Sequence, residues 1–346
     1  MEFKKHLIGR EENVRAALTK LNNLGSDAIL FVIDEGERLM GSLTDGDVRR
    51  GFIKGLDFDS RLVEFIQPNP IFIDKDKYDI KHFHEYKVRN YKVIPILNKD
   101  HQIIDILNFR LQRSLLPVDA LIMAGGEGRR LRPLTDKTPK PLLKVGDKPI
   151  IEHNIERLRL YGIQNIYISI KYLGEQLISH FGDGSAHGVN IQYIREEEPL
   201  GTIGAVSLIG RLPHTTLLVM NSDLLTNIDF EDFYLTHLEK HSDMTVAAVP
   251  YQVKVPYAVL ETQDHTVLSF IEKPTYTYYS NGGIYLIEKD LISWVPNGHY
   301  NATDLMQEVI ARKRRLINYP LLGYWLDIGR HEDFEKAQAD IKHINL

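Results

Sequence analysis

A short apolar run, Ala120–Ala124, leads without a break into a glycine-rich loop, Gly125–Gly128. An apolar run of this length that ends at glycines is typical of a buried strand. Three glycines in four positions let backbone N–H groups approach an anion closely, because no Cβ stands in the way. Arg129 and Arg130 follow at once, and Lys140 lies further on between two prolines. The sequence therefore predicts a strand that ends in an anion-binding loop, with charges suited to a triphosphate.

The composition is that of an ordinary globular protein of about two or three domains. The chain has 346 residues, and its 42 Lys+Arg are outnumbered by 47 Asp+Glu, so no overall basic field favours nucleic acid. The absence of cysteine excludes disulfides and thiolate zinc sites and is consistent with a reducing compartment. No apolar run reaches about 18 residues, and the N-terminus lacks a signal-peptide core. We therefore expect a cytoplasmic protein that binds neither membranes nor nucleic acid.

The first third of the chain contains a faint internal repeat. A strand–turn–strand pattern at 31–43 recurs at 95–107, and a stretch of helical character precedes each copy, at 13–23 and 80–89. Such a repeat predicts two β–α units packed as one smaller α+β domain. Pro117 interrupts the pattern just before the next strand. We therefore divide the chain into a domain at 1–112, a linker at 113–118 and a second domain at 119–346.

Strands and helices alternate in the second domain. A helix is expected after Pro149, with an apolar face that ends near Gly162. Further strands are expected at 166–170 and 217–220, and further helices at 204–209 and 230–241. This alternation predicts a mostly parallel sheet with helices on both faces. Ligands of such sheets bind at the carboxyl ends of the strands, where both the glycine-rich loop and Asn221-Ser222-Asp223 are expected.

The glycine-rich loop matches neither the P-loop nor the dinucleotide fingerprint. The segment 125–145 instead resembles the signature of the sugar-nucleotidyltransferases, also called nucleotide-sugar pyrophosphorylases. Five later segments resemble further motifs of that family in order: Glu198–Ala205, Asn221–Asp223, Glu272–Pro274, Asn281–Tyr285 and Trp325–Gly329. The resemblance covers roughly residues 119 to 335. It implies a Rossmann-like α/β fold with a mixed, mostly parallel sheet, and transfer of NMP from an NTP to a sugar 1-phosphate with release of pyrophosphate.

The resemblance assigns the phosphate-binding residues. It implies that Arg130 holds the leaving phosphates together with the backbone of the loop, and a bidentate guanidinium suits that role. Lys140 matches the lysine beside the transferred phosphate. Lys273 matches the lysine that binds the sugar phosphate, with Glu272 beside it for a sugar hydroxyl. The residues implied to contact the nucleotide are Ala124, Gly125, Gly126, Gly128, Glu196, Gly201 and Thr202. We expect Arg129 to be a solvated arginine.

Two aspartates lie in apolar surroundings, Asp223 after a strand and Asp327 within Tyr324–Ile328. A carboxylate in such a place needs a cation or hydrogen bonds. The resemblance makes Asp223 and Asp327 the pair that binds Mg²⁺, the cofactor expected here. The alternative for Asp327 is a helix cap, since Gly329 and a helical stretch follow.

Glu196 bears on the identity of the base. It matches a position where relatives that use pyrimidines often carry glutamine, and a carboxylate only accepts hydrogen bonds, which suits the N1–H and N2–H₂ donors of guanine. This favours GTP, with UTP or dTTP as the alternative, and a plain solvated acidic run at 196–198 remains open. Asn281 resembles a sugar-contacting asparagine. Ala258 stands where relatives usually have glycine against the sugar, so the sugar is not identified.

The N-terminal repeat resembles a pair of cystathionine-β-synthase-type (CBS) modules, which often bind adenine nucleotides. Gly41–Asp47 carries the resemblance, and Thr44 and Asp47 would contact phosphate and ribose. The second copy has Asn108 and Leu111 at these positions, so at most one adenine-nucleotide site is supported. A packing or dimerisation module without a ligand is the alternative. We expect a homo-oligomer, and a non-catalytic, nucleotide-sensing subunit is the competing hypothesis for the whole chain.

Overall fold

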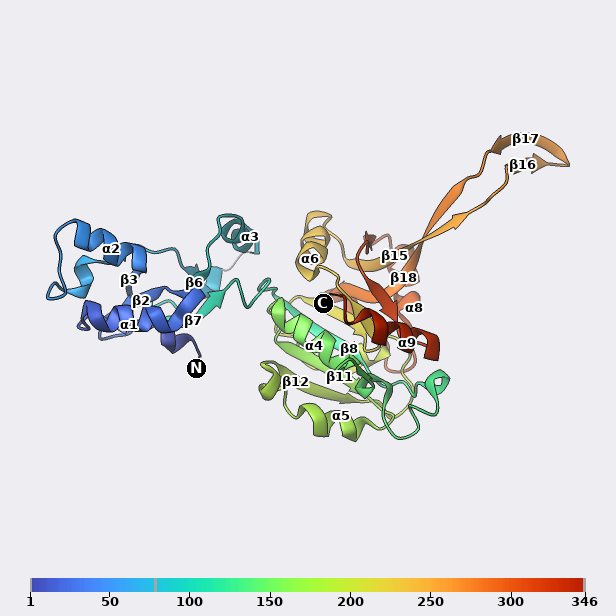
Figure 1. The fold of residues 1–346 in the computed structure, drawn as a ribbon. Coiled ribbons are helices and arrows are strands. Elements are labelled where there is room, and N and C mark those ends of the chain that lie inside the picture. Colours follow the sequence, from blue (N-terminus) through green and yellow to red (C-terminus); the bar gives the residue numbers. More distant parts are fainter. Residues whose placement is uncertain (1, 78–79, 345–346) are drawn as a thin grey trace. The chain divides into compact units, whose positions relative to one another are not determined.

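The computed structural model describes residues 2–77 and 80–344 (Figure 1). It divides into two compact units, Met1–Leu115 and Leu116–Leu346, and the division falls inside the predicted linker at 113–118. The outer ends of the two predicted domains, residues 1 and 346, lie outside the described residues. The two units are therefore described one at a time.

The N-terminal unit contains two small sheets. The first has the order β1-β2-β3-β4, with bounds Leu7–Gly9, Leu30–Ile33, Leu39–Leu43 and Gln67–Pro68. The second has the order β5-β6-β7, with bounds Ile73–Asp74, Val93–Leu97 and Ile103–Asn108. The helices are α1 (Val14–Leu24), α2 (Asp45–Ile53) and α3 (Ile80–Val88).

The predicted internal repeat is confirmed in this unit. β2 and β3 form one antiparallel hairpin, and β6 and β7 form another. Both hairpins shift register at the same place, between Val32 and Ile33 in the first and between Ile96 and Leu97 in the second. α1 and α3 occupy the stretches of expected helical character. The two halves of the unit thus share a local geometry as well as a sequence pattern.

The C-terminal unit is built on a seven-stranded sheet of order β12-β11-β8-β13-β18-β15-β19. The first four strands are parallel, β18 is antiparallel to both of its neighbours, and β19 is parallel to β15. The bounds, in sheet order, are Asn190–Arg195, Asn165–Ile170, Val118–Met123, Thr216–Asn221, Thr275–Glu288, Met244–Lys254 and Leu316–Pro320. A two-stranded ladder of β14 (Leu224–Thr226) and β20 (Trp325–Asp327) lies apart from it. The predicted mixed, parallel-rich sheet is confirmed.

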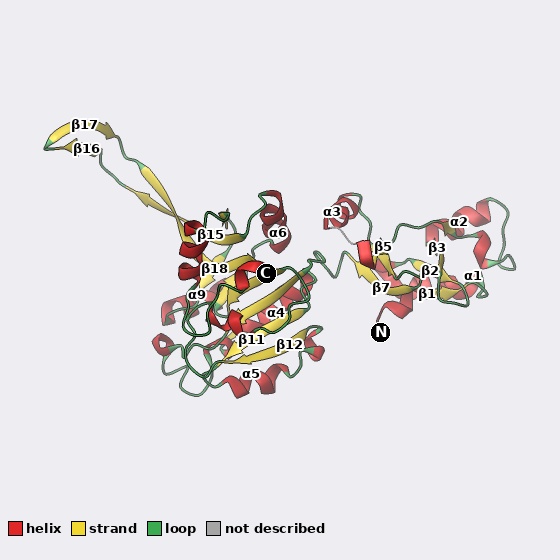
Figure 2. Cartoon of the chain, turned by 180° about the vertical axis from the view of Figure 1, so that it is seen from behind, coloured by secondary structure: helices red, strands yellow, loops and turns green. Residues whose placement is uncertain are grey.

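Helices flank this sheet (Figure 2). They are α4 (Ile150–Leu160), α5 (Gly174–Phe181), α6 (Phe230–Glu239), α7 (Lys289–Ile292), α8 (Ala302–Ala311) and α9 (His331–Asp340). α4 begins after Pro149 and closes before Gly162, as expected. The helix expected at 204–209 is a short 3₁₀ helix, Gly204–Leu208, and the N–H groups of Ile203 and Gly204 at its start donate to the carbonyl of Tyr300.

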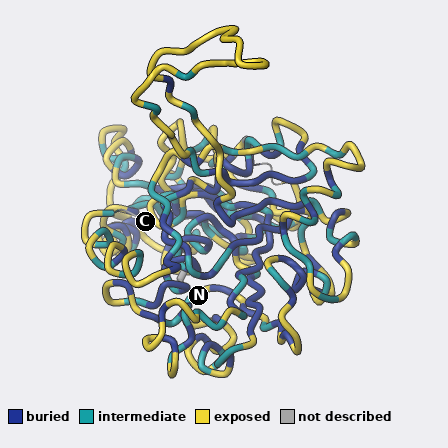
Figure 3. Tube along the Cα trace, turned by 90° about the vertical axis from the view of Figure 1, so that its right-hand side faces the viewer, coloured by how far each residue is buried: buried dark blue, intermediate teal, exposed yellow. Residues whose placement is uncertain are grey.

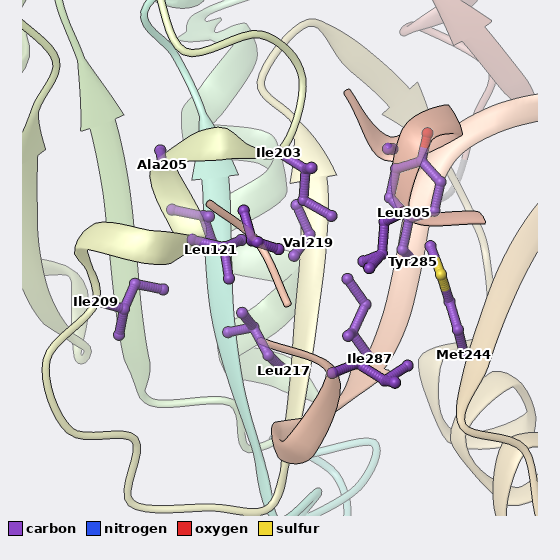
Figure 4. Close-up of a cluster of buried hydrophobic side chains, with 14 of the residues drawn as sticks. Leu121, Ile203, Ala205, Ile209, Leu217, Val219, Met244, Tyr285, Ile287 and Leu305 are labelled. Carbon is purple, nitrogen blue, oxygen red and sulfur yellow. The ribbon is translucent and has the colours of Figure 1, made fainter. Parts of the chain in front are cut away.

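Both faces of the sheet are buried. Leu121 of β8, Val219 of β13 and Tyr285 of β18 pack with the 203–209 segment and with α8 (Figure 4). Successive strand residues point to opposite faces. The alternate residues Ala120 and Ile122 are also fully buried, so the second face is covered as well. This double burial explains why these strands read as continuous apolar runs in the sequence.

One hairpin leaves the body of the C-terminal unit. β15 and β18 stay paired beyond the sheet as far as the pair Lys254–Thr275, and β16 (Val259–Gln263) and β17 (Thr266–Ile271) form its tip. Figure 1 shows the tip projecting away from the sheet, and Figure 3 shows most of the projection coloured as exposed. We call residues 249–280 the arm. None of the helices in the described part of the chain has both the length and the apolarity needed to cross a lipid bilayer.

Candidate active site

A cavity of about 540 Å³ opens at the carboxyl ends of the parallel strands β8, β11 and β13. The glycine-rich loop after β8 forms one wall, and the segment 221–223 after β13 forms another. The segment 199–202 closes the far side. Further lining residues are Met123, Ala124, Arg129, Arg130, Lys140, Pro141, Lys171, Glu196, His299 and Gly329. The predicted loop and the predicted acidic segment are therefore brought together in one cavity.

The three glycines of the loop differ in how much space a Cβ would have at each position. Gly128 has φ +62°, and a Cβ there would lie 3.0 Å from the Cβ of Lys140 and from Cγ2 of Thr135. A Cβ on Gly125 would lie 3.0 Å from Oε1 of Glu196, whereas a Cβ on Gly126 would meet nothing within 4 Å. Gly125 and Gly128 are thus needed for close packing, and Gly126 leaves its backbone open to the cavity.

The cationic side of the cavity is formed by Arg130 and Lys140. Lys140 is largely buried and its ammonium donates to the carboxylate of Asp223. A guanidinium nitrogen of Arg130 lies 3.6 Å from the point where a Cβ on Gly329 would stand. Arg129 is 75% exposed and donates to Glu127 at 2.7 and 3.0 Å, as expected of a solvated arginine.

Asp223 and Asp327 face one another across the β14–β20 ladder. Leu224 pairs with Asp327 in that ladder, and the N–H of Ile328 donates to the carbonyl of Asp223 at 3.1 Å. Burial, and next the negative charge of Asp223, raise the pKa of Asp327, while Lys140 and Arg130 act against this shift. Oδ1 of Asp327 is enclosed and has no hydrogen-bond partner among the described residues.

This orphaned oxygen fits a divalent cation. An enclosed carboxylate oxygen without a partner is costly, so it marks a place where a positive charge is missing. Mg²⁺ commonly binds through one or two carboxylates together with substrate phosphates and water. The described residues contain no group of three or more His, Cys, Asp or Glu that could hold a metal. The helix-cap alternative for Asp327 is wrong, because Arg330 is the N-cap of α9.

The far side of the cavity is held by the start of α8. Gly201 has φ +78°, and a Cβ there would lie 2.7 Å from the carbonyl oxygen of Tyr300. The Thr202 hydroxyl accepts from the N–H of Ala302 at 2.9 Å, and the Thr202 N–H donates to Oδ1 of Asn301 at 3.3 Å. Oε2 of the nearly buried Glu196 accepts from the N–H of Leu200 at 3.1 Å. Glu196 is thereby fixed with its carboxylate against the glycine-rich loop.

None of the four residues predicted for the sugar side lines the cavity. Ala258, Glu272 and Lys273 are on the arm, and all three are exposed. Asn281 lies at the base of the arm, where its Oδ1 accepts from the N–H of Gly283 and from the hydroxyl of Tyr285, both at 2.9 Å. The structure of the single chain thus assembles the nucleotide half of the predicted site but not the sugar-phosphate half.

The sequence analysis missed two polar residues of the cavity, Lys171 and His299. Lys171 immediately follows β11, and its ammonium donates to the carbonyl of Glu197 at 2.7 Å. Its position at the carboxyl end of an expected buried strand was a signal that could have identified it. His299 lies in the loop before α8, and no pattern in the sequence indicates its proximity.

In the N-terminal unit, Thr44 and Asp47 form a helix cap. The N–H and the hydroxyl of Thr44 donate to Oδ2 of Asp47 at 2.8 and 2.6 Å, and Arg50 donates to its Oδ1 at 2.5 Å. A separate cavity of about 240 Å³ in this unit is lined by neither residue. Asn108, at the position of Thr44 in the second copy, donates to the buried Asp27 together with Arg110, which lowers the pKa of Asp27 to about 2.

Comparison with known proteins agrees with this geometry. The model of the family described as "Nucleotidyl transferase" matches residues 119–344. A mannose-1-phosphate guanylyltransferase from Mycobacterium tuberculosis is 32% identical over 231 residues, which are 65% of this chain and 64% of that protein. A D-glycero-alpha-D-manno-heptose 1-phosphate guanylyltransferase from Aneurinibacillus thermoaerophilus is 29% identical over 65% of this chain and 99% of its own length.

Among solved structures, HddC from Yersinia pseudotuberculosis matches with a TM-score of 0.51 and 27% identity, over 64% of this chain and 99% of that one. The same protein has been solved in complex with GMP-PN. The family match falls on the unit that carries the cavity and spans well over half of the chain. The chain therefore belongs to the nucleotidyl transferase family.

Proposed function

We propose that the protein transfers GMP from GTP to a sugar 1-phosphate and releases pyrophosphate. The observation that carries this proposal is one cavity lined by the glycine-rich loop, Arg130, Lys140 and Asp223. Asp327 does not line it but lies beside Asp223 at the β14–β20 ladder. A triphosphate needs donors and cations along its length, and the chemistry needs little else from the protein. Two guanylyltransferases among the relatives support the reaction class.

The reaction is an in-line displacement at the α-phosphorus. A phosphate oxygen of the sugar 1-phosphate forms the new P–O bond as the bond to the pyrophosphate oxygen breaks. The loop amides and Arg130 hold the β- and γ-phosphates and stabilise the charge that develops on pyrophosphate. Lys140, fixed by Asp223, places a compact positive charge beside the transferred group. Asp223 and Asp327 would hold Mg²⁺, which would neutralise the negative charge that develops on the phosphates.

Guanine is the proposed base because of Glu196. Its carboxylate lies against Gly125 at the edge of the cavity, where it can accept from the N1–H and N2–H₂ groups of guanine. The GMP-PN complex of a related protein and the names of the guanylyltransferase relatives support this choice. UTP or dTTP is the alternative, in which Glu196 serves only to hold the 199–202 segment.

The reaction is tested by pyrophosphate release with Mg²⁺ across all common NTPs and a panel of sugar 1-phosphates. We expect turnover with GTP and an absolute dependence on divalent cation. Turnover with UTP or dTTP but not with GTP would contradict the base assignment. The absence of turnover with every pair would favour a non-catalytic, nucleotide-sensing subunit.

For the N-terminal unit we propose a CBS-type pair, spanning 1–112, that serves regulation or dimerisation in a cytoplasmic homo-oligomer. The paired hairpins with matching register shifts support the duplication. An adenine nucleotide at Thr44 and Asp47 would have to compete with the helix cap that these residues form. Calorimetric titration with AMP, ADP and ATP distinguishes a ligand-binding module from one that only packs.

A further inference from the structure

The cavity lacks the residues expected to hold the acceptor phosphate, and the arm carries them. Glu272 and Lys273 follow β17 and are exposed, and neither lines the cavity. Lys273 has φ +43°, a backbone conformation that is uncommon for a residue with a side chain. Lys273 is thus an exposed lysine at a turn of the arm, outside the lining of the cavity.

The arm is a continuous ribbon that leads away from its own cavity. β15 and β18 pair without interruption from Ala248–Asn281 to Lys254–Thr275, and the N–H of Val255 extends the ladder to Pro274 at 3.0 Å. Lys254 is six residues beyond Ala248 along β15, which at about 3.3 Å per residue is about 20 Å. Lys273 lies further out still. Returning it to its own cavity would require breaking or sharply bending this ladder.

The arm is also unusually apolar for an exposed element. Half of the large apolar side chains exposed among the described residues belong to it, including Phe270 at 66% and Tyr257 at 74% exposure. The others are Tyr251, Val253, Leu260, Val267, Leu268, Ile271, Tyr278 and Tyr279. An isolated two-stranded hairpin is marginally stable in water, and an exposed apolar surface of this kind marks an interaction site. The arm therefore needs a surface to pack against.

Two exposed apolar side chains of the C-terminal unit lie close in sequence to segments of the site, although neither lines the cavity. Leu134, in the segment between the glycine-rich loop and Lys140, is exposed. Leu322, in the loop that leads into β20 and Asp327, is 84% exposed. Both lie next to segments that line the cavity or hold its acidic pair. The arm carries Glu272 and Lys273, and both are missing from the lining of the cavity.

We propose that two copies of this chain exchange their arms, so that Glu272 and Lys273 of each copy complete the sugar-phosphate side of the cavity of the other. The exchange is reciprocal, because the same surface acts as donor and acceptor in a two-fold symmetric dimer. The role given to Lys273 rests on the proposed function. The exchange of the arms does not, because it depends only on where the arm of each copy lies. The two are tested separately below.

The first test is complementation between two inactive variants. Arg130→Ala removes a group of the body, and Lys273→Ala removes a group of the arm. The two variants are co-expressed with different tags and purified through both, so that every dimer contains one copy of each. Exchange places the intact arm of the Arg130→Ala copy on the intact body of the Lys273→Ala copy. The hybrid should then recover about half of the wild-type activity per dimer, since one of its two sites is complete.

The matched control is a hybrid of Arg130→Ala with Lys140→Ala. Both residues belong to the body, so neither site of this hybrid is complete and no recovery is expected. If the Arg130→Ala and Lys273→Ala hybrid also stays inactive while the wild type turns over, each arm serves its own copy and the proposal is overturned.

The second test does not depend on activity. The chain contains no cysteine, so introduced thiols are the only ones present. A hybrid of one Lys273→Cys copy with one His299→Cys copy is treated with bismaleimides of graded length. Exchange predicts a covalent dimer on a denaturing gel. Intramolecular cross-linking of the double variant Lys273→Cys/His299→Cys, with no dimer from the hybrid, would overturn the proposal whether or not the protein proves to be a transferase.

Discussion

At the scale of single residues, the site contains positions at which a substitution should change the stability of the protein in opposite directions. Asp327 is partly buried without a hydrogen-bond partner for Oδ1, which costs the folded protein stability. Gly201 and Gly128 adopt left-handed backbone conformations in contact with neighbouring chain, whereas Gly126 meets nothing. Substitutions at these three kinds of position should therefore differ in their effects on stability and activity.

Asp327→Asn should abolish metal-dependent pyrophosphate release while making the metal-free protein more stable at pH 7. The pKa of Asp327 is raised in the folded state, so its ionisation opposes folding above that pKa. The stability difference between variant and wild type should therefore shrink as the pH falls through the raised pKa towards the ordinary range of a carboxyl group. Thermal unfolding without metal at pH 7 and near pH 4 measures this. A variant that is less stable than wild type at pH 7 would contradict the claim that the ionised, unpartnered carboxylate of Asp327 destabilises the folded protein.

Gly201→Ala should destabilise the protein by about 1–3 kcal/mol, because a Cβ is strained at this φ and meets the carbonyl of Tyr300. Gly126→Ala is the matched control, since its φ is unexceptional and its Cβ would point into open space. Denaturant unfolding measures both changes. We expect Gly126→Ala to leave stability nearly unchanged and to weaken nucleotide binding, and equal losses of stability would refute the distinction.

At the scale of elements, the start of α8 positions the far wall of the cavity. Oδ1 of Asn301 accepts from the N–H of Thr202, and the Asn301 N–H donates to Asp304 in a capping box. The sequence predicted the strands and their carboxyl-end ligands well, because apolar runs and glycines are local signals. It did not predict that α8, a hundred residues away, would hold Thr202, because that contact depends on how the chain returns to the sheet.

Asn301→Ala should cost about 1 kcal/mol of stability, because it removes an N-cap side chain. It should also raise the KM for the NTP more than it lowers kcat, since the 199–202 segment loses one of its anchors. Steady-state kinetics and denaturant unfolding measure these effects. Asn301→Asp, which keeps an acceptor oxygen at the position of Oδ1, should retain most of the stability, and an equal loss in that variant would contradict the capping role.

At the scale of the whole molecule, the division between the units lies close to buried groups of the catalytic body. Leu116 is buried, and its N–H donates to the carbonyl of Tyr161 at 2.9 Å. Asp119 is fully buried and accepts from the N–H and ring of His214 and from Asn165, which lower its pKa against the opposing effect of burial. The catalytic unit therefore needs the chain from about residue 116 onward.

A chain that begins at residue 116 should fold and keep GTP-dependent turnover, whereas one that begins at residue 120 should be much less stable. The longer form retains Leu116 and Asp119, and the shorter one leaves His214 and Asn165 without their acceptor. Circular dichroism melting and pyrophosphate release compare the two. Equal stability of both forms would mean that the buried carboxylate of Asp119 does not contribute to folding.

The sequence alone determined the class of sheet and the phosphate loop, because these depend on local patterns, namely apolar runs and glycines at sharp turns. The pairing of Asp223 with Asp327 came as a hypothesis from the family resemblance. Only the tertiary structure decided which predicted residues share a cavity. Lys273 and Glu272 lie in a motif that the sequence assigns to the same site, but the hydrogen-bond ladder of β15 and β18 carries them away from it. The register and direction of a hairpin depend on how its strands pair with the rest of the sheet, and a local sequence pattern does not determine that pairing.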